Sequence, residues 1–328
     1  REHKRNNQTT DDMKKKLLWS AVIVASTLFA VMIGSGFYML DYALSNADRS
    51  KKKSYAYVMK NYPETLPWLD SLRHNGILRD TFIVMPDGER AHAIFARSDS
   101  ARGRTAVVVH GYKDRSTGML HIAYIYNKVM GYNILLPDLH GHGLSDGDDI
   151  QMGWKDRLDV MHWMGVAERM FRQDGCESRM VVHGVSMGAA TTMNIAGERT
   201  PGYVKCFVED CGYTSAWDEF AHEMKKRFDL HEFPLLYVSS MLCKLKYGWS
   251  FGEASPVRQL KNSHKPMLFI HGGKDDFVPT EMVYPCYEAK PQPKSLWIAP
   301  GSAHAVSYRD HKKEYTGRVK AFVEKWNR

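Results

Sequence analysis

The chain has 328 residues, of which 44% are hydrophobic and 25% charged, a composition that is ordinary for a globular protein. Its net charge of +8 is concentrated at one end, because residues 1–60 contain eleven Lys or Arg and five Asp or Glu, whereas the rest contains 34 against 32. A basic segment beside an apolar run is typical of membrane topology, so the charge argues against a nucleic-acid partner.

The first predicted element is an apolar run over residues 17–40, which are 24 residues without a formal charge. A helix of that length is about 36 Å long, enough to cross a hydrocarbon core of about 30 Å. A basic tail, residues 1–16, precedes it. A cleaved signal peptide is the alternative, but its apolar region normally has about 7–15 residues. We therefore predict an uncleaved transmembrane anchor over residues 17–40.

The orientation of this anchor follows from the lysines at 14–16, which directly precede it. They favour a cytoplasmic N-terminus and place the remainder of the chain outside the cytoplasm, although the basic residues at 49 and 51–53 make the asymmetry small. Five cysteines without a C-x-x-C pair are interpreted as small buried hydrophobes. The sequence indicates no oligomeric state.

Residues 41–78 are a polar connecting segment that becomes partly helical, and a pattern of short apolar runs follows it. Eight runs predict strands, at residues 81–85, 91–96, 105–110, 132–137, 179–183, 204–209, 267–271 and 295–299. Helical spacing appears between or after the later ones, at residues 154–171, 189–196, 281–289 and 308–326. The first two strands lack an intervening helix, which indicates an antiparallel start. Several later runs are almost continuously apolar, so we predict a doubly wound, mostly parallel eight-stranded α/β sheet.

The alternation is interrupted at about residues 213–262, which are rich in aromatic residues. An uninterrupted coil of that length is unusual. We therefore predict a helical insertion there, lying as a lid over the carboxyl ends of the strands.

The strongest local signal is Gly184-Val185-Ser186-Met187-Gly188, which directly follows a predicted strand and precedes a predicted helix. A serine on a sharp strand-to-helix turn needs small neighbours, and the helix N-terminus directs N–H groups at developing negative charge. We therefore predict that Ser186 is a nucleophile. The alternative is a glycine-lined turn that holds an ordinary serine.

A serine alone is a poor nucleophile and requires a base and an orienting acid. His304 lies in a loop of small residues after the last strand and is the predicted base. Asp275 follows the strand at 267–271 and is the predicted acid. We prefer it to Asp276, because a second loop carboxylate is more often a solvated charge or a helix cap.

An oxyanion hole must accompany these groups, and the backbone N–H groups of Tyr112 and Met187 are its predicted donors. His110, at the end of a strand, is predicted to be structural. Residues 138–146 contain two histidines near aspartates but no further ligand at metal-site spacing, so they predict a glycine-rich turn at the pocket wall. We expect no metal, and the absence of G-x-G-x-x-G and G-x-x-x-x-G-K-[ST] indicates no nucleotide cofactor.

The segments HGY, DLHGHGLSDG, HGVSMGA, HGGKDDFVP and GSAHA occur in this order along the chain. Together they resemble the α/β-hydrolase superfamily and, within it, bacterial membrane-anchored hydrolases related to the serine aminopeptidase and BEM46-like groups. The resemblance implies a hydrolase domain over residues 79–328 and matches Ser186, Asp275 and His304 to the family's nucleophile, acid and base. Ala305 stands where many relatives have glycine.

These features predict a serine hydrolase that cleaves a carboxylic ester of a small acyl substrate. The aromatic insertion with its basic residues is compatible with an apolar acyl pocket, and equally with a lid that packs its apolar side on the domain. A serine peptidase is the second interpretation, because no acidic clamp for a substrate amino group can be identified. A membrane-tethered binding protein without turnover is the third.

Overall fold

The computed structural model describes residues 2–46 and 55–328, with side chains from residue 12 onward in the first part. Residues 47–54 of the predicted connecting segment, with the basic residues at 49 and 51–53, lie outside the described residues. Two compact units are present. The helical unit comprises the described residues up to Ala43 together with Met224–Ser250, and the sheet unit comprises Leu44–Glu223 and Phe251–Arg328.

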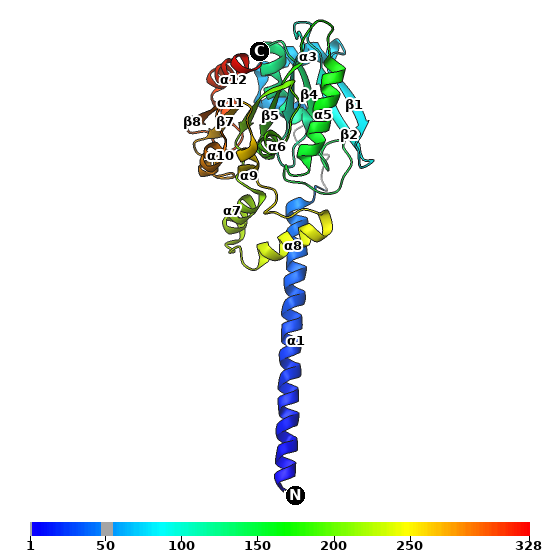
Figure 1. The fold of residues 1–328 in the computed structure, drawn as a ribbon, viewed down its shortest axis with the longest axis vertical. Coiled ribbons are helices and arrows are strands. Elements are labelled where there is room, and N and C mark those ends of the chain that lie inside the picture. Colours follow the sequence, from blue (N-terminus) through cyan, green and yellow to red (C-terminus); the bar gives the residue numbers. More distant parts are fainter. Residues whose placement is uncertain (1, 47–54) are drawn as a thin grey trace. The chain divides into compact units, whose positions relative to one another are not determined.

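Eight strands form one sheet in the order β1-β2-β4-β3-β5-β6-β7-β8 (Figure 1). Their bounds are β1 Arg79–Val84, β2 Arg90–Ala96, β3 Arg104–Val109, β4 Asn133–Pro137, β5 Arg179–Val185, β6 Val204–Asp210, β7 Met267–Gly272 and β8 Lys294–Ala299. β2 pairs antiparallel with β1 and with β4, and every other pairing is parallel. The predicted mostly parallel sheet with an antiparallel start is therefore confirmed.

The helices of the sheet unit precede, connect or follow these strands. They are α2 Tyr55–Asn61, α3 Leu66–His74, α4 Leu120–Tyr124, α5 Asp156–Phe171, α6 Met187–Ala196, α9 Pro256–Gln259, α10 Val283–Ala289, α11 Ser307–Asp310 and α12 Lys312–Trp326. Short 3₁₀ turns are η1 Pro63–Thr65, η2 Ser116–Met119, η4 Leu260–Asn262 and η5 Thr280–Met282, and η3 Ile125–Val129 is a π-helical turn. The helix predicted over residues 308–326 is interrupted at His311, where the backbone leaves the helical region.

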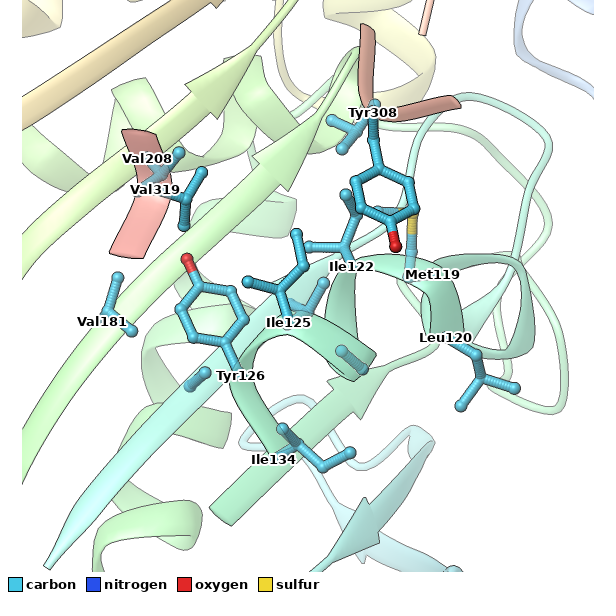
Figure 2. Close-up of a cluster of buried hydrophobic side chains, with 14 of the residues drawn as sticks. Met119, Leu120, Ile122, Ile125, Tyr126, Ile134, Val181, Val208, Tyr308 and Val319 are labelled. Carbon is cyan, nitrogen blue, oxygen red and sulfur yellow. The ribbon is translucent and has the colours of Figure 1, made fainter. Parts of the chain in front are cut away.

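At the central strands both faces of the sheet are buried, as almost continuously apolar strands require, whereas the edge strand β1 is largely exposed. Along β3, Ala106 and Val108 belong to one hydrophobic cluster, whereas the alternate residues Val107 and Val109 are equally buried but are not members of it. Successive side chains of a strand point to opposite faces, so these two pairs line different faces. Figure 2 shows part of the cluster, including Tyr126, Val181 and Val319.

Part of the predicted connecting segment lies in this core. Val58 on α2 and Trp68, Leu69 and Leu72 on α3 are buried members of the same cluster. The Trp68 indole N–H also donates a hydrogen bond of 2.8 Å to Asn127 Oδ1. The predicted segment is therefore partly helical, as expected, and its residues 55–74 also contribute to the core of the sheet unit.

The helical unit contains α1, which runs from Glu2 to Leu44, and α8, Leu235–Tyr247. The predicted anchor falls inside α1, whose stretch Asp12–Leu44 is long and apolar enough to cross a membrane by length and composition. Its apolar window has a mean hydropathy of 2.2 and is not buried. α1 therefore differs from the core helix of a soluble domain, which is mostly buried.

The predicted insertion at about residues 213–262 is helical. It leaves the sheet after β6, returns to it at β7, and contains α7, Ala216–Phe228, followed by α8, α9 and η4. α7 begins in the sheet unit and ends in the helical unit. The insertion therefore connects the two units.

Candidate active site

Ser186 lies on a sharp turn between β5 and α6, with backbone angles of φ 59° and ψ −121°. This φ lies in the left-handed region, which is costly for a residue with a side chain. A Cβ atom on Gly184 would lie 1.9 Å from the carbonyl oxygen of Gly188, and one on Gly188 would lie 2.2 Å from the carbonyl oxygen of Val109. Only glycine fits at either position, which explains the spacing of the motif.

This packing predicts that Gly184→Ala strongly destabilises the protein. The added methyl group meets backbone atoms that cannot move aside, so we expect a loss of about 3 kcal/mol and a fall in Tm of about 6–12 °C. Gly317→Ala is the matched control, because Gly317 lies inside α12 with no atom within 4 Å of an added Cβ. It should stabilise by about 0.5–1 kcal/mol. Equal Tm values for the two variants in a thermal melt would contradict the packing argument.

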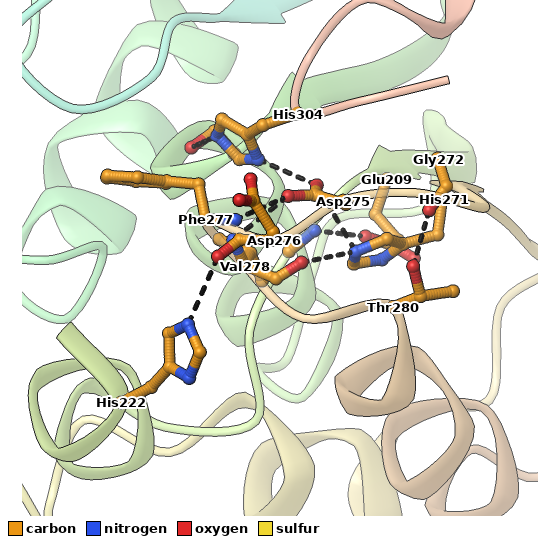
Figure 3. A network of polar contacts seen from close by, with 12 residues as sticks. Glu209, His222, His271, Gly272, Asp275, Asp276, Phe277, Val278, Thr280 and His304 are labelled. Atoms are coloured by element: carbon orange, nitrogen blue, oxygen red, sulfur yellow. Dashed lines mark hydrogen bonds and ion pairs between the residues drawn. The ribbon is translucent and has the colours of Figure 1, made fainter. Parts of the chain in front are cut away.

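The structure brings Ser186, His304 and Asp275 together. His304 Nε2 lies 2.9 Å from Ser186 Oγ, and His304 Nδ1 lies 2.8 Å from Asp275 Oδ2. The three residues follow β5, β8 and β7, which are parallel and therefore end at the same edge of the sheet. Figure 3 shows the His304 ring beside the Asp275 carboxylate. The neighbouring Asp276 side chain is exposed.

Asp275 is held as a carboxylate by its surroundings. Its Oδ1 accepts hydrogen bonds from the backbone N–H groups of Phe277 and Val278, at 3.1 and 3.0 Å. Burial raises the pKa of Asp275, but hydrogen bonds from His271 and His304 outweigh that effect and lower it to about 2. At neutral pH this carboxylate accepts the Nδ1–H of His304. That hydrogen bond leaves Nε2 as an acceptor for the Ser186 hydroxyl.

The two residues predicted for an oxyanion hole belong to segments that adjoin Ser186. Met187 is the first residue of α6, and the first N–H groups of a helix have no partner within it. Tyr112 follows Gly111, where an added Cβ would lie 3.1 Å from Ser186 Cβ. The turn that contains Tyr112 is held by the loop around His142, because the Lys113 N–H donates a hydrogen bond of 3.3 Å to His142 Nε2. Two backbone segments therefore approach the same serine.

His271 and Glu209 are fully buried near Asp275 (Figure 3). The sequence predicted no role for either residue. His271 Nε2 lies 3.0 Å from the Val278 carbonyl oxygen and 3.4 Å from Asp275 Oδ2. Burial lowers the pKa of His271, but its hydrogen bond to Asp275 counters that effect, and the pKa is raised overall. Burial raises the pKa of Glu209 to about 8. The sequence feature that could have indicated a role for His271 is its position four residues before Asp275.

The other histidines singled out by the sequence stabilise loops. His110 is fully buried, with Nδ1 2.8 Å from the Gly111 carbonyl oxygen and Nε2 accepting the Leu139 N–H at 3.0 Å. His140 contacts Glu89 at 2.7 Å and Asp149 at 3.2 Å. The rings of His110 and His140 are therefore both engaged in contacts with their surrounding loops.

One group of possible metal ligands occurs among the residues whose side chains are described, namely Cys211, Asp275 and His304, with ligand atoms within 4.8 Å of one another. Burial raises the pKa of the Cys211 thiol well above its usual value, which opposes the thiolate form that binds metals. Asp275 and His304 are already hydrogen-bonded to each other. This set of donors therefore does not fit a metal ion.

The eight-stranded fold, together with the family match that follows, identifies a hydrolase of the α/β-hydrolase superfamily. Residues 126–328, more than half of the chain, match the model of the prolyl oligopeptidase family. The chain belongs to that family.

The chain is also similar to individual proteins. YqkD of Bacillus subtilis is 28% identical over 223 residues, which are 68% of this chain and 72% of YqkD. The esterase Pf2001 of Pyrococcus furiosus superposes with a TM-score of 0.61 at 23% identity, covering 78% of this chain and 96% of that one. Est1E of Butyrivibrio proteoclasticus, solved with ferulic acid bound, gives a TM-score of 0.57 at 19% identity, covering 75% and 98%. At these identities the solved structures establish a shared fold.

Proposed function

We propose that the protein cleaves carboxylic esters by acyl transfer to water, with Ser186 as nucleophile, His304 as base and Asp275 as orienting acid. The observation that carries the proposal is the unbroken chain of hydrogen bonds from Asp275 through His304 to Ser186 Oγ, at 2.8 and 2.9 Å. The strained backbone of Ser186 supports it, since such strain is concentrated at functional sites.

The proposed reaction has two steps. Ser186 Oγ attacks the ester carbonyl carbon while its proton passes to His304 Nε2, and the Met187 and Tyr112 N–H groups stabilise the oxyanion. The tetrahedral intermediate collapses, and His304 returns the proton to the departing alcohol. Water then attacks the acyl-enzyme with His304 again as base, which releases the carboxylic acid and restores the serine.

The preference for esters is supported by the proteins of similar fold. Pf2001 is an esterase, and Est1E was solved with ferulic acid, an aromatic carboxylic acid. A serine peptidase is the second candidate, and the match to the prolyl oligopeptidase family favours it. Both candidates use the same triad chemistry, so the scissile bond must be determined with substrates.

A substrate panel distinguishes these candidates. The full chain in detergent is assayed with p-nitrophenyl esters of increasing acyl length, a feruloyl ester, and aminoacyl and prolyl p-nitroanilides. We expect saturable hydrolysis of the esters, with a chain-length optimum set by the pocket, and no measurable cleavage of the anilides. Faster turnover of an anilide than of any ester would instead assign the protein to the peptidases.

We also propose that residues 17–40 are a retained membrane anchor and that the sheet unit is extracytoplasmic. The unburied apolar window of α1 supports an anchor. Its retention is supported by Gly36, which packs against α8 and would be lost with a cleaved leader. Lipid adducts from a photoreactive residue at position 29 in reconstituted protein test the anchor, and their absence would contradict it.

The helical insertion is proposed to act as a lid. It departs from the carboxyl end of β6 and returns to β7, and Asp275 follows β7. A lid at this edge would exclude water from the acyl-enzyme.

A further inference from the structure

α8 carries an apolar stripe on its exposed side. Phe233, just before the helix, and Tyr237, Met241 and Leu245 within it are 77, 54, 51 and 76% exposed. Residues four apart lie on the same side of a helix, so Tyr237, Met241 and Leu245 form one row, which the Phe233 ring extends beside Tyr237. These four side chains are the α8 stripe. The Phe233 and Tyr237 rings are 5.9 Å apart. A soluble protein rarely exposes such a row without a partner for it.

The opposite side of α8 is packed within the helical unit. A Cβ atom on Gly36 of α1 would lie 2.8 Å from Val238 Cγ1 and 2.9 Å from Leu242 Cδ1. Ser239 Oγ donates a hydrogen bond of 3.4 Å to the Gly36 carbonyl oxygen. The small residue lets the two helices approach closely, as glycines do at helix crossings. α8 therefore crosses α1 at Gly36 (Figure 1).

This crossing lies at a particular depth along the proposed anchor. Gly36 is about 28 Å along the helix from Leu17, where the uncharged run begins, at 1.5 Å per residue. The hydrocarbon core of a bilayer is about 30 Å thick. With Leu17 at one boundary, the second boundary falls close to Gly36, and α8 lies at that level.

The basic residues around the α8 stripe also fit a location at the boundary of the bilayer. The segment Met224–Ser250 contains five Lys or Arg and two acidic residues. Lys225, Lys226 and Arg227 precede the stripe, Lys244 and Lys246 lie at its end, and all five are exposed. Basic side chains beside an apolar row are typical of helices that lie in the headgroup region, with cations at lipid phosphates and apolar groups among the acyl chains.

We propose that α8 lies in the interface of the bilayer that α1 spans, with the α8 stripe inserted among the acyl chains and its lysines at the lipid phosphates. The proposal rests on the membrane anchor proposed above. It assigns to the helical insertion a second role, that of a membrane-bound element adjoining the anchor.

Photocrosslinking to lipid tests this placement. p-Benzoylphenylalanine replaces Met241 or Leu245 in the full chain, which is reconstituted into vesicles of phosphatidylcholine and phosphatidylglycerol, irradiated, and analysed by mass spectrometry. The same residue at Phe29 is the positive control for insertion. At Leu158, which is 53% exposed on α5, it is the control for an exposed apolar position of the sheet unit. We expect lipid adducts at Met241 and Leu245 at least 10-fold above those at Leu158.

Each other outcome would overturn the proposal in a recognisable way. Adducts at Phe29 alone would retain the anchor and remove α8 from the interface. Crosslinks from Met241 to a second copy of the chain would assign the stripe to a dimer contact. No adduct at Phe29 would contradict the anchor itself, and equal yields at Leu158 and Leu245 would show that the contact is nonspecific. Because none of these readouts depends on turnover, failure of the proposed hydrolysis would be detected separately, by the ester assay.

Discussion

Replacing Ser186 by alanine is expected to lower kcat for ester hydrolysis by about 10⁴- to 10⁶-fold, the range found when a triad serine is removed. The variant has no oxygen at the site that His304 Nε2 contacts at 2.9 Å, so no acyl-enzyme can form. The fold should persist, because alanine retains the Cβ atom and the backbone. Steady-state kinetics on the best ester of the panel measures the effect.

Ser263→Ala is the matched control for this variant. Ser263 is also buried, and its hydroxyl has no hydrogen-bond partner in the described structure. Its removal should leave kcat within about twofold of the wild-type value, since it contributes neither a contact to the site nor a hydrogen bond to stability. More than a tenth of wild-type activity in Ser186→Ala, with an unchanged Tm, would refute the assignment of the nucleophile.

Asp275→Asn is expected to lower kcat by about 10⁴-fold, as the equivalent change does in other serine hydrolases. The asparagine oxygen can still accept the Phe277 and Val278 N–H groups that now bind Oδ1. Its NH₂ group then faces His304 Nδ1, at the position of Oδ2. A donor there requires Nδ1 to accept, so the ring proton moves to Nε2 and the base can no longer take the Ser186 proton.

Asp276→Asn is the control, because it removes a neighbouring carboxylate whose side chain is exposed. It should change kcat by less than about twofold. The loss in Asp275→Asn should appear at every pH above 4, since the wild-type carboxyl has a pKa of about 2 and stays ionised over that range. A larger loss in Asp276→Asn than in Asp275→Asn, measured as kcat against pH, would reverse the choice between the two acids.

Most of the sheet could be predicted from the sequence because its strands are nearly continuous apolar runs between turn residues. β4, for example, was expected at 132–137 and occupies Asn133–Pro137. The turn at Ser186 was predictable for a different reason. Its glycines are imposed by backbone contacts, and such contacts leave a signal at fixed spacing.

Other features depend on partners that are remote in the sequence. The hydrogen bond from Trp68 to Asn127 joins residues 59 apart. The contact between Gly36 and Ser239 spans 203 residues. Patterns within a short stretch of sequence cannot predict these contacts, because only the fold brings the partners together.

The central claim is that Ser186 is an activated nucleophile, and labelling with a fluorophosphonate tests it most directly. The full chain is treated with the probe, digested, and mapped by mass spectrometry beside His304→Ala. We expect a single adduct, on Ser186, at a stoichiometry near one, and a large loss of labelling rate in His304→Ala, because the unassisted hydroxyl reacts poorly. No adduct on Ser186, or equal labelling in His304→Ala, would contradict the proposed triad and favour a membrane-tethered binding protein.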